Sequence, residues 1–150
     1  MRVPLVAATD PILYAPVPRV TDFAAPEVDL TSRQLIVTVI SEGGLGLAAP
    51  QIGVALAMFV AFTEVGTLLA INPHLEGIGT EMETRTERCL SLPGVSVEVP
   101  RHRRVRLAAY NIKGAAWEVE LDGMDARIVQ HEFDHLHGKL ITHYERHDHD

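Results

Sequence analysis

The chain has 150 residues, of which 47% are hydrophobic and 22% are charged, and its formal net charge is -7. This length and balance predict one globular domain over residues 1–150, with a hydrophobic core and little room for a second domain. The negative charge argues against a nucleic-acid-binding surface. The one local basic run, RHRRVR at residues 101–106, is expected on the solvated face of a strand, with phosphate binding as the weaker alternative.

The compartment is indicated by what the sequence lacks. Cys89 is the only cysteine, which excludes an internal disulfide and favours a reducing environment. The start, MRVPLVAATDPILY, has neither the basic end nor the continuous apolar stretch of a secretory signal. The longest apolar run, residues 54–62, is far shorter than the roughly 20 residues of a membrane-spanning helix. We therefore expect a cytoplasmic protein with no membrane association.

A helix and then several strands are predicted in chain order. Apolar residues at a spacing of four predict a helix over about residues 30–42, with Thr31 or Ser32 as its cap. Short apolar or alternating runs predict strands at residues 55–62, 67–71, 95–99, 104–110 and 117–121. The second of these strands is expected to end at Asn72–Pro73, and a hairpin turn is expected between the last two.

A second helix is predicted from Asp122, whose side chain can cap it, to Gly138. At about 100° per residue, one narrow stripe of this helix contains Met124, Ile128, His131 and His135. A second apolar stripe lies roughly opposite, so the helix is expected to be buried on two sides with its histidines pointing into the protein. The polar residues 143–150 are interpreted as a flexible tail.

The sequence HEFDH at residues 131–135 predicts a metal site on this second helix. Two inward imidazoles one turn apart can bind a single cation, whereas the alternative is a pair of core histidines satisfied by hydrogen bonds. Metal binding is favoured because burying two histidines and Glu132 without a common purpose is costly. An extended metalloprotease pattern would supply a third histidine at position 141, but Ile141 stands there, and Glu145 lies close to the chain end.

An upstream ligand is offered by Cys89 in ERCLS, residues 87–91. A thiolate is a strong ligand for zinc or iron, although a lone cysteine is more often a small buried hydrophobe. The run GGLGLAAPQIG at residues 43–53 consists of small residues that allow a backbone to approach a ligand closely. It lacks the Lys-Ser/Thr ending of a phosphate loop, so nucleotide binding is not expected.

Three segments together resemble the motifs of peptide deformylases: GLGLAAPQ (44–51), ERCLS (87–91) and HEFDH (131–135), in this order. The flanking segments DPILYAPVPRVTDF and QHEFDHLHGKL are also similar, so the resemblance covers nearly the whole chain. It implies an α+β fold with antiparallel strands packed around a central metal-binding helix. It also implies removal of the formyl group from the N-terminal formylmethionine of newly made polypeptides, with one divalent metal ion, usually ferrous iron and alternatively zinc or nickel.

The resemblance implies a role for each matching residue. Cys89, His131 and His135 would hold the metal and leave a fourth position for water, whose pKa the metal lowers. Glu132 would act as the general base and then the general acid.

Two hydrogen-bond donors are implied for the oxygen of the tetrahedral intermediate, the Gln51 side-chain amide and the Leu90 backbone N–H. For Gln51, bracing of the loop is the structural alternative. The substrate peptide would lie extended beside Leu45 and Gly46 and pair with them like an added strand.

The methionine side chain would enter an apolar pocket, for which the candidates are Leu45, Met124 and Ile128; the two helix residues could equally be ordinary core. Arg88 stands where the family normally has glycine before the cysteine, and its side chain either extends into solvent or narrows the cleft and contacts substrate. Arg127 is expected to pair with an acid such as Asp125 or Glu87.

Two competing functions stay open at this level. One is a catalytically impaired deformylase-like protein that binds formylated peptides, supported only by Arg88. The other is a zinc peptidase, which lacks its downstream ligand. The last residues, HYERHDHD, are mixed and acidic, unlike the basic helix that docks some relatives on the ribosome, so only transient proximity to the ribosome is expected.

Overall fold

The computed structural model describes residues 2–149, and the side chains of residues 2–145. Its elements, in chain order, are η1 (Pro11–Tyr14), α1 (Pro26–Glu42), β1 (Gly46–Ala48), η2 (Ala49–Ile52), β2 (Met58–Thr63), β3 (Gly66–Gly77), β4 (Met82–Cys89), β5 (Leu92–His102), β6 (Arg104–Tyr110), β7 (Ala116–Asp122), α2 (Gly123–Leu136) and η3 (Ile141–His149). Within this part of the chain, no helix combines the length and the apolar character needed to span a bilayer.

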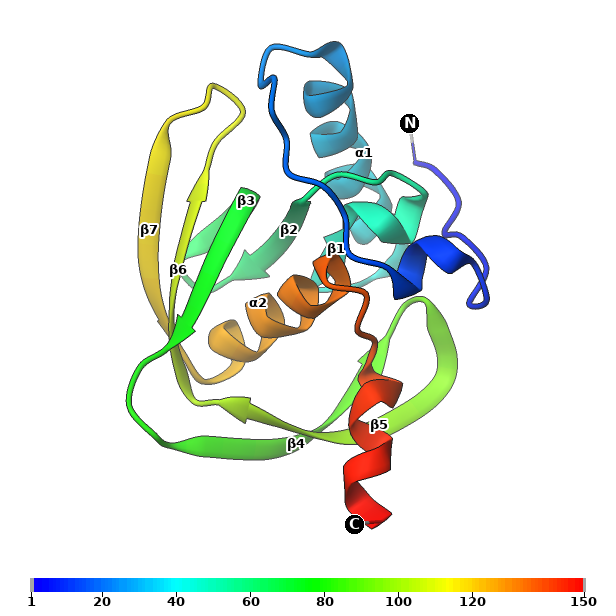
Figure 1. Ribbon diagram of the computed structural model, residues 1–150, viewed down its shortest axis with the longest axis vertical. Coiled ribbons are helices and arrows are strands. Elements are labelled where there is room, and N and C mark those ends of the chain that lie inside the picture. The colour runs from blue at the N-terminus through cyan, green and yellow to red at the C-terminus, as the bar shows by residue number, and fades with distance from the viewer. Residues whose placement is uncertain (1, 150) are drawn as a thin grey trace.

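The strands form two antiparallel sheets around α2 (Figure 1). The larger sheet has the order β1-β2-β3-β6-β7, and β4 and β5 form a separate two-stranded ribbon. In Figure 1, α2 runs through the middle of the molecule, with strands of the larger sheet on one side and the ribbon below it. This arrangement confirms the predicted α+β fold with antiparallel strands around a central helix.

One side of α2 packs in the hydrophobic core, and another side carries the two histidines. Ala126 and Val129 are fully buried and belong to the same apolar cluster as Phe59 of the larger sheet. Burying such side chains stabilises the fold by roughly 25 cal/mol for each Å² of apolar surface removed from water. His131 and His135 lie on another side, with His135 only 1% exposed. The prediction that the histidine pair points into the protein is confirmed.

The first helix begins earlier than the sequence pattern predicts. Pro26 occupies its first turn, where a residue without an N–H leaves no helical hydrogen bond unmade. Thr31 and Ser32, predicted as caps, lie inside the helix and are buried. Gly43 ends the helix in the left-handed conformation with φ 71°, as glycine permits.

β3 continues through the dipeptide that was predicted to end it. The register of β3 against β6 shifts between Ile71 and His74, and Asn72 has φ 50°. The Asn72 side chain accepts a hydrogen bond from the Val20 N–H at 2.8 Å and donates one to the Val20 carbonyl at 2.9 Å. This bulge accommodates Pro73, which has no N–H for the strand ladder.

The tail predicted at residues 143–150 falls largely within the last described element, and its flexibility stays a prediction. Ile141–His149 form the 3-10 helix η3, while Asp150 lies outside the described residues. The Tyr144 hydroxyl donates to Asp134 of α2 at 2.6 Å. A half-buried tyrosine with a charge-assisted hydrogen bond therefore attaches η3 to the central helix.

Candidate active site

Three candidate metal ligands meet where the ribbon approaches α2. β4 ends at Cys89, and α2 carries His131 and His135 one turn apart. One ligand atom from each residue lies within 4.8 Å of the other two, and the Cys89 Sγ is 3.5 Å from the His135 Nε2. A thiolate and two imidazoles are the donor set that zinc and iron accept. Burial lowers the pKa of His135 well below its usual value, which favours the neutral, metal-binding form.

Glu87 orients the first of the two histidines. Its Oε1 lies 2.9 Å from the His131 Nδ1, and both side chains are largely buried. Arg101 donates to both carboxylate oxygens of Glu87, at 2.9 and 2.8 Å, and Arg127 donates to one of them at 2.6 Å. Burial by itself raises the pKa of Glu87, but the hydrogen bonds from Arg101 and His131 outweigh it and hold the pKa well below its usual range. The ionised carboxylate fixes the imidazole through Nδ1 and leaves Nε2 for a ligand.

The burial of Arg101 corrects one expectation from the sequence. Arg101 opens the basic run 101–106 that was assigned to a solvated face, yet it is only 3% exposed. Besides Glu87, it donates to Asp134 at 2.5 Å, and a buried guanidinium requires such partners. The other arginines of the run do lie at the surface. Arg127 pairs with Glu87, one of its two predicted partners.

Glu132 lies beside the candidate ligands in a buried environment, on the side of α2 that lines a cleft. It is 4% exposed, and its Oε1 has no hydrogen-bond partner among the described groups. Burial raises the pKa of Glu132 to about 7. A Cβ on Gly46 would lie 2.7 Å from the Glu132 Oε2, so the glycine provides the room that this carboxyl occupies. A carboxyl group with a near-neutral pKa is suited to both proton uptake and proton release.

Gln51 is held in place by two hydrogen bonds. Its Oε1 accepts from the Ala48 N–H at 2.9 Å, and its Nε2 donates to the Ser91 Oγ at 2.9 Å. The same Nε2 lies 3.8 Å from the Cys89 Sγ, a weak contact. The bracing role considered for Gln51 is therefore present, and the amide nitrogen also reaches the candidate metal centre. Leu90, the other predicted donor, lies in the turn between β4 and β5.

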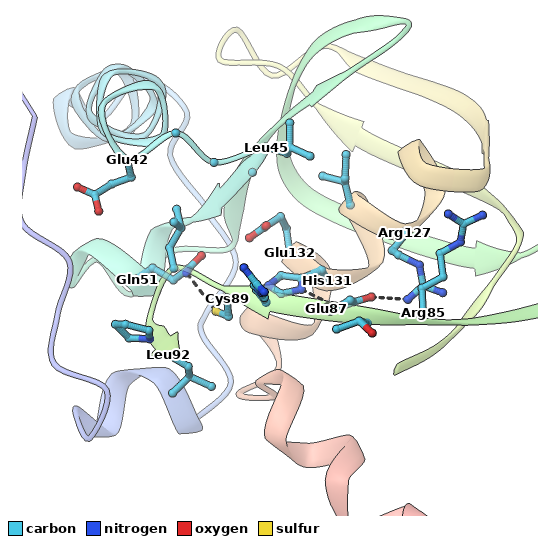
Figure 2. A pocket seen from close by; sticks show the side chains of 18 of the residues that line it. Glu42, Leu45, Gln51, Arg85, Glu87, Cys89, Leu92, Arg127, His131 and Glu132 are labelled. Carbon is cyan, nitrogen blue, oxygen red and sulfur yellow. Dashed lines mark hydrogen bonds and ion pairs between the residues drawn. The ribbon is translucent and has the colours of Figure 1, made fainter. Parts of the chain in front are cut away.

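A cleft of about 580 Å³ opens above these groups (Figure 2). Its lining includes all but one of the predicted site residues: Leu45, Gly46, Gln51, Arg88, Cys89, Leu90, Met124, Ile128, His131 and Glu132. The exception is His135, which is buried. Leu45 and Met124 are 55% and 50% exposed at the cleft, as expected of apolar side chains that receive a ligand.

Arg88 does not block the metal centre. Glu87 and Cys89 on either side of it are buried, so strand alternation directs Arg88 to the opposite face of β4. Its side chain is exposed, and its Nε donates to the Ser96 Oγ at 3.3 Å. The side chain is thus exposed and also lines the rim of the cleft, and its contact with substrate stays a prediction.

β1 is an edge strand, since β2 is the one strand that pairs with it in the described part of the chain. The Leu45 carbonyl accepts from the Phe62 N–H of β2 at 2.8 Å, and Gly46 pairs opposite Ala61. Because backbone groups alternate in an antiparallel pair, the N–H and C=O of Gly46 point away from β2. This edge can pair with an extended peptide.

Comparison with known proteins identifies relatives of the chain. A family model described as polypeptide deformylase matches residues 3–149. A peptide deformylase of Thermotoga sp. strain RQ2 is 40% identical over 132 residues, which cover 88% of this chain and 80% of the relative. The crystal structure of peptide deformylase from Thermotoga maritima superposes with a TM-score of 0.90 at 37% identity, covering 95% of this chain and 97% of that one. The class I type b peptide deformylase from Acinetobacter baumannii, crystallised with Met-Ala-Ser, superposes with a TM-score of 0.89 at 25% identity, covering 95% and 99%.

Proposed function

Because this chain belongs to the peptide deformylase family, we propose that it removes the formyl group from the N-terminal formylmethionine of newly made polypeptides and releases formate. The observation that carries the proposal is the convergence of Cys89, His131 and His135 beside Glu132 at a cleft. The thiolate and the two imidazoles would hold one divalent ion, for which we propose ferrous iron, with zinc or nickel as substitutes. Such a substrate implies work in the cytoplasm, transiently near the ribosome.

Glu132 is the proton carrier in the proposed mechanism. Cys89, His131 and His135 would hold a divalent ion, which when bound would supply Lewis-acid chemistry and lower the pKa of a water molecule. Glu132 accepts a proton from the water that attacks the formyl carbon and delivers it to the departing amine nitrogen. Since burial raises its pKa to about 7, the carboxyl can both take up and release a proton near neutral pH.

Two donors serve the oxygen of the former formyl group. The Gln51 Nε2 lies 3.8 Å from the Cys89 Sγ. The Leu90 N–H belongs to the residue that directly follows Cys89, in the turn between β4 and β5. Both would donate to the oxygen as negative charge develops on it. Losing one such donor typically lowers turnover by ~10²–10³-fold.

The peptide would lie extended along the open edge of β1 and exchange backbone hydrogen bonds with Gly46. Leu45, Met124 and Ile128 line the cleft and would surround the methionine side chain. The A. baumannii relative binds Met-Ala-Ser, which is the tripeptide that remains when formyl-Met-Ala-Ser loses its formyl group. This likeness supports the proposed class of substrate.

The proposal is tested by measuring formate release from formyl-Met-Ala-Ser by protein loaded with ferrous iron under anaerobic conditions. We expect catalytic release, reduced by ~10²–10⁴-fold in Glu132→Ala, as for the loss of a general base. Folded, iron-loaded protein that binds the peptide without releasing formate would overturn the proposal in favour of a formylpeptide-binding protein. Cleavage of an internal peptide bond would instead favour the zinc peptidase.

A further inference from the structure

Arg88 presents a free cationic group at the cleft. It directly precedes Cys89, its side chain is exposed, and its one hydrogen bond is from Nε to the neutral Ser96 Oγ. Among the described side chains, no carboxylate forms an ion pair with Arg88. The outer nitrogens of its guanidinium therefore remain available to a ligand.

Among the side chains of residues 2–145, most other surface arginines form ion pairs with nearby acids. Ion pairs with a glutamate or an aspartate are made by Arg2, Arg33, Arg85, Arg103, Arg104 and Arg106. The chain has a net charge of -7, so an arginine without an ion pair beside the candidate metal centre makes the local charge positive where the molecule as a whole is negative. A cleft with a local positive charge attracts anionic groups of a ligand.

The path of the peptide brings its second residue to this arginine. The argument rests on the proposed function, in which the formyl carbon lies beside Cys89 and the peptide is extended along β1. Successive side chains of an extended chain point to opposite sides, about 3.3 Å apart along the strand. When the methionine side chain points toward Ile128 and the core, the next side chain points outward, toward the rim of the cleft that Arg88 lines.

We propose that Arg88 is a specificity-determining residue that favours formylated peptides with aspartate or glutamate directly after the methionine. A carboxylate there accepts hydrogen bonds from the two outer nitrogens of the guanidinium in a bidentate pair, whereas a lysine is repelled. The nearby acids do not cancel this effect. Glu42, which also lines the cleft, forms an ion pair with Arg2 at 3.7 Å, and Glu87 is buried in its ion pair with Arg101.

The test compares formyl-Met-Glu-Ser, formyl-Met-Gln-Ser and formyl-Met-Lys-Ser as substrates of the iron-loaded enzyme. The glutamate and glutamine peptides are nearly isosteric, so their comparison isolates the charge. We expect kcat/KM to favour glutamate over glutamine by roughly two- to fivefold, mainly through KM, as for an exposed ion pair. Lysine should be the poorest of the three. The preference should shrink in 1 M salt, where the screening length falls to about 3 Å.

Two variants test whether the preference for an acidic second residue depends on Arg88. Arg88→Gln should abolish the ranking of the three peptides. Arg33→Gln makes the same charge change at an exposed arginine of α1 that pairs with Asp29 at 2.9 Å outside the cleft, and it should keep the ranking.

Equal kcat/KM values for the three peptides, or an unchanged ranking in Arg88→Gln, would overturn this proposal and leave the deformylase function intact. Absence of formate from all three peptides would instead count against the proposed function. In that case, calorimetric binding of Met-Glu-Ser and Met-Gln-Ser still decides the role of Arg88, since equal affinities would refute it.

Discussion

The position of the Glu132 carboxyl depends on the absence of a side chain at residue 46. An ideal Cβ on Gly46 would lie 2.7 Å from the Glu132 Oε2, closer than real Cβ atoms approach other groups, and 3.0 Å from its Cγ, which is also a tight contact. Gly46→Ala must therefore displace Glu132 while the three metal ligands stay in place. A displacement of about 1 Å in a catalytic group can cost ~10²-fold in rate. We expect a loss of this order in kcat/KM for formyl-Met-Ala-Ser, with unchanged metal content.

A double-mutant cycle separates this effect from direct contact between Gly46 and the peptide. In a Glu132→Ala background the displaced group is absent, so adding Gly46→Ala should cost little further activity. If Gly46→Ala causes the same loss in both backgrounds, Gly46 acts on the substrate backbone and not through Glu132.

At the scale of elements, a buried ionic group joins β4, β5 and α2. Glu87 lies on β4, Arg101 on β5, and Arg127 and His131 on α2, and all are at least largely buried. Glu87→Gln leaves the buried Arg127 guanidinium without a carboxylate and leaves Arg101 with Asp134 alone, which should destabilise the fold by roughly 3–5 kcal/mol. It should also weaken metal binding by about 10- to 100-fold, because His131 loses its orienting partner. Urea unfolding and competition with a chelator measure the two effects.

Asp29→Asn is the matched control for this prediction. Asp29 pairs with Arg33 on the exposed face of α1 at 2.9 Å, so the same chemical change occurs in contact with water. Its unfolding midpoint and metal affinity should match those of the unaltered protein. Equal effects of Asp29→Asn and Glu87→Gln would show that burial of the ionic group does not matter.

The attachment of η3 to α2 gives a second prediction at this scale. The Tyr144 hydroxyl donates to Asp134 at 2.6 Å and accepts from Arg101 at 3.2 Å. Burial and the bond to Asp134 raise the pKa of Tyr144, so it remains a donor across the neutral range. Tyr144→Phe should lower the free energy of unfolding by about 1.5–3 kcal/mol, the usual loss for a hydrogen bond to a charged group. No change in the urea midpoint would mean that η3 is held by its apolar contacts alone.

The same elements explain what the sequence can predict. The helix α2 and its histidine stripe are predicted correctly because the 3.6-residue spacing of its residues is a local property of the sequence, and the folded helix keeps that spacing. The sequence does not predict β4, because strands are recognised by apolar residues at every second position and the buried residues of β4 are Glu87 and Cys89, of which the first is charged. Glu87 lies two residues before a candidate ligand, so a strand assignment would have placed both on one face.

The remaining discrepancies arise from contacts between distant parts of the chain. Arg101 is buried because Glu87 and Asp134 surround it, and nothing in its local sequence distinguishes it from its exposed neighbours. The continuation of β3 depends on Asn72, whose side chain bonds to Val20 from the N-terminal segment. Such long-range satisfaction of polar groups overrides the local signal of a strand end.

At the scale of the whole molecule, the free energy of unfolding of the metal-free protein should depend on pH through His131. Burial by itself lowers the pKa of His131, but the hydrogen bonds with Cys89 and Glu87 outweigh it and raise the pKa to about 10. The unfolded value is about 6.5, so the folded state holds an extra proton between these two values. The stabilisation is therefore complete below pH 6.5, declines above it and is lost as the pH passes about 10.

Between pH 8 and 9 this dependence is isolated, because Glu132, whose folded pKa of about 7 lies below this range, is ionised there, as it is in the unfolded chain. Urea unfolding of the metal-free protein should show stability falling with a slope of at most ~1.4 kcal/mol per pH unit. A zinc ion bound to His131 occupies the nitrogen that would carry the proton, so the zinc-loaded protein should not lose stability over this range. It should also gain ~2.7 kcal/mol when free zinc is 100 times its dissociation constant. A parallel decline with and without zinc would contradict metal binding by His131.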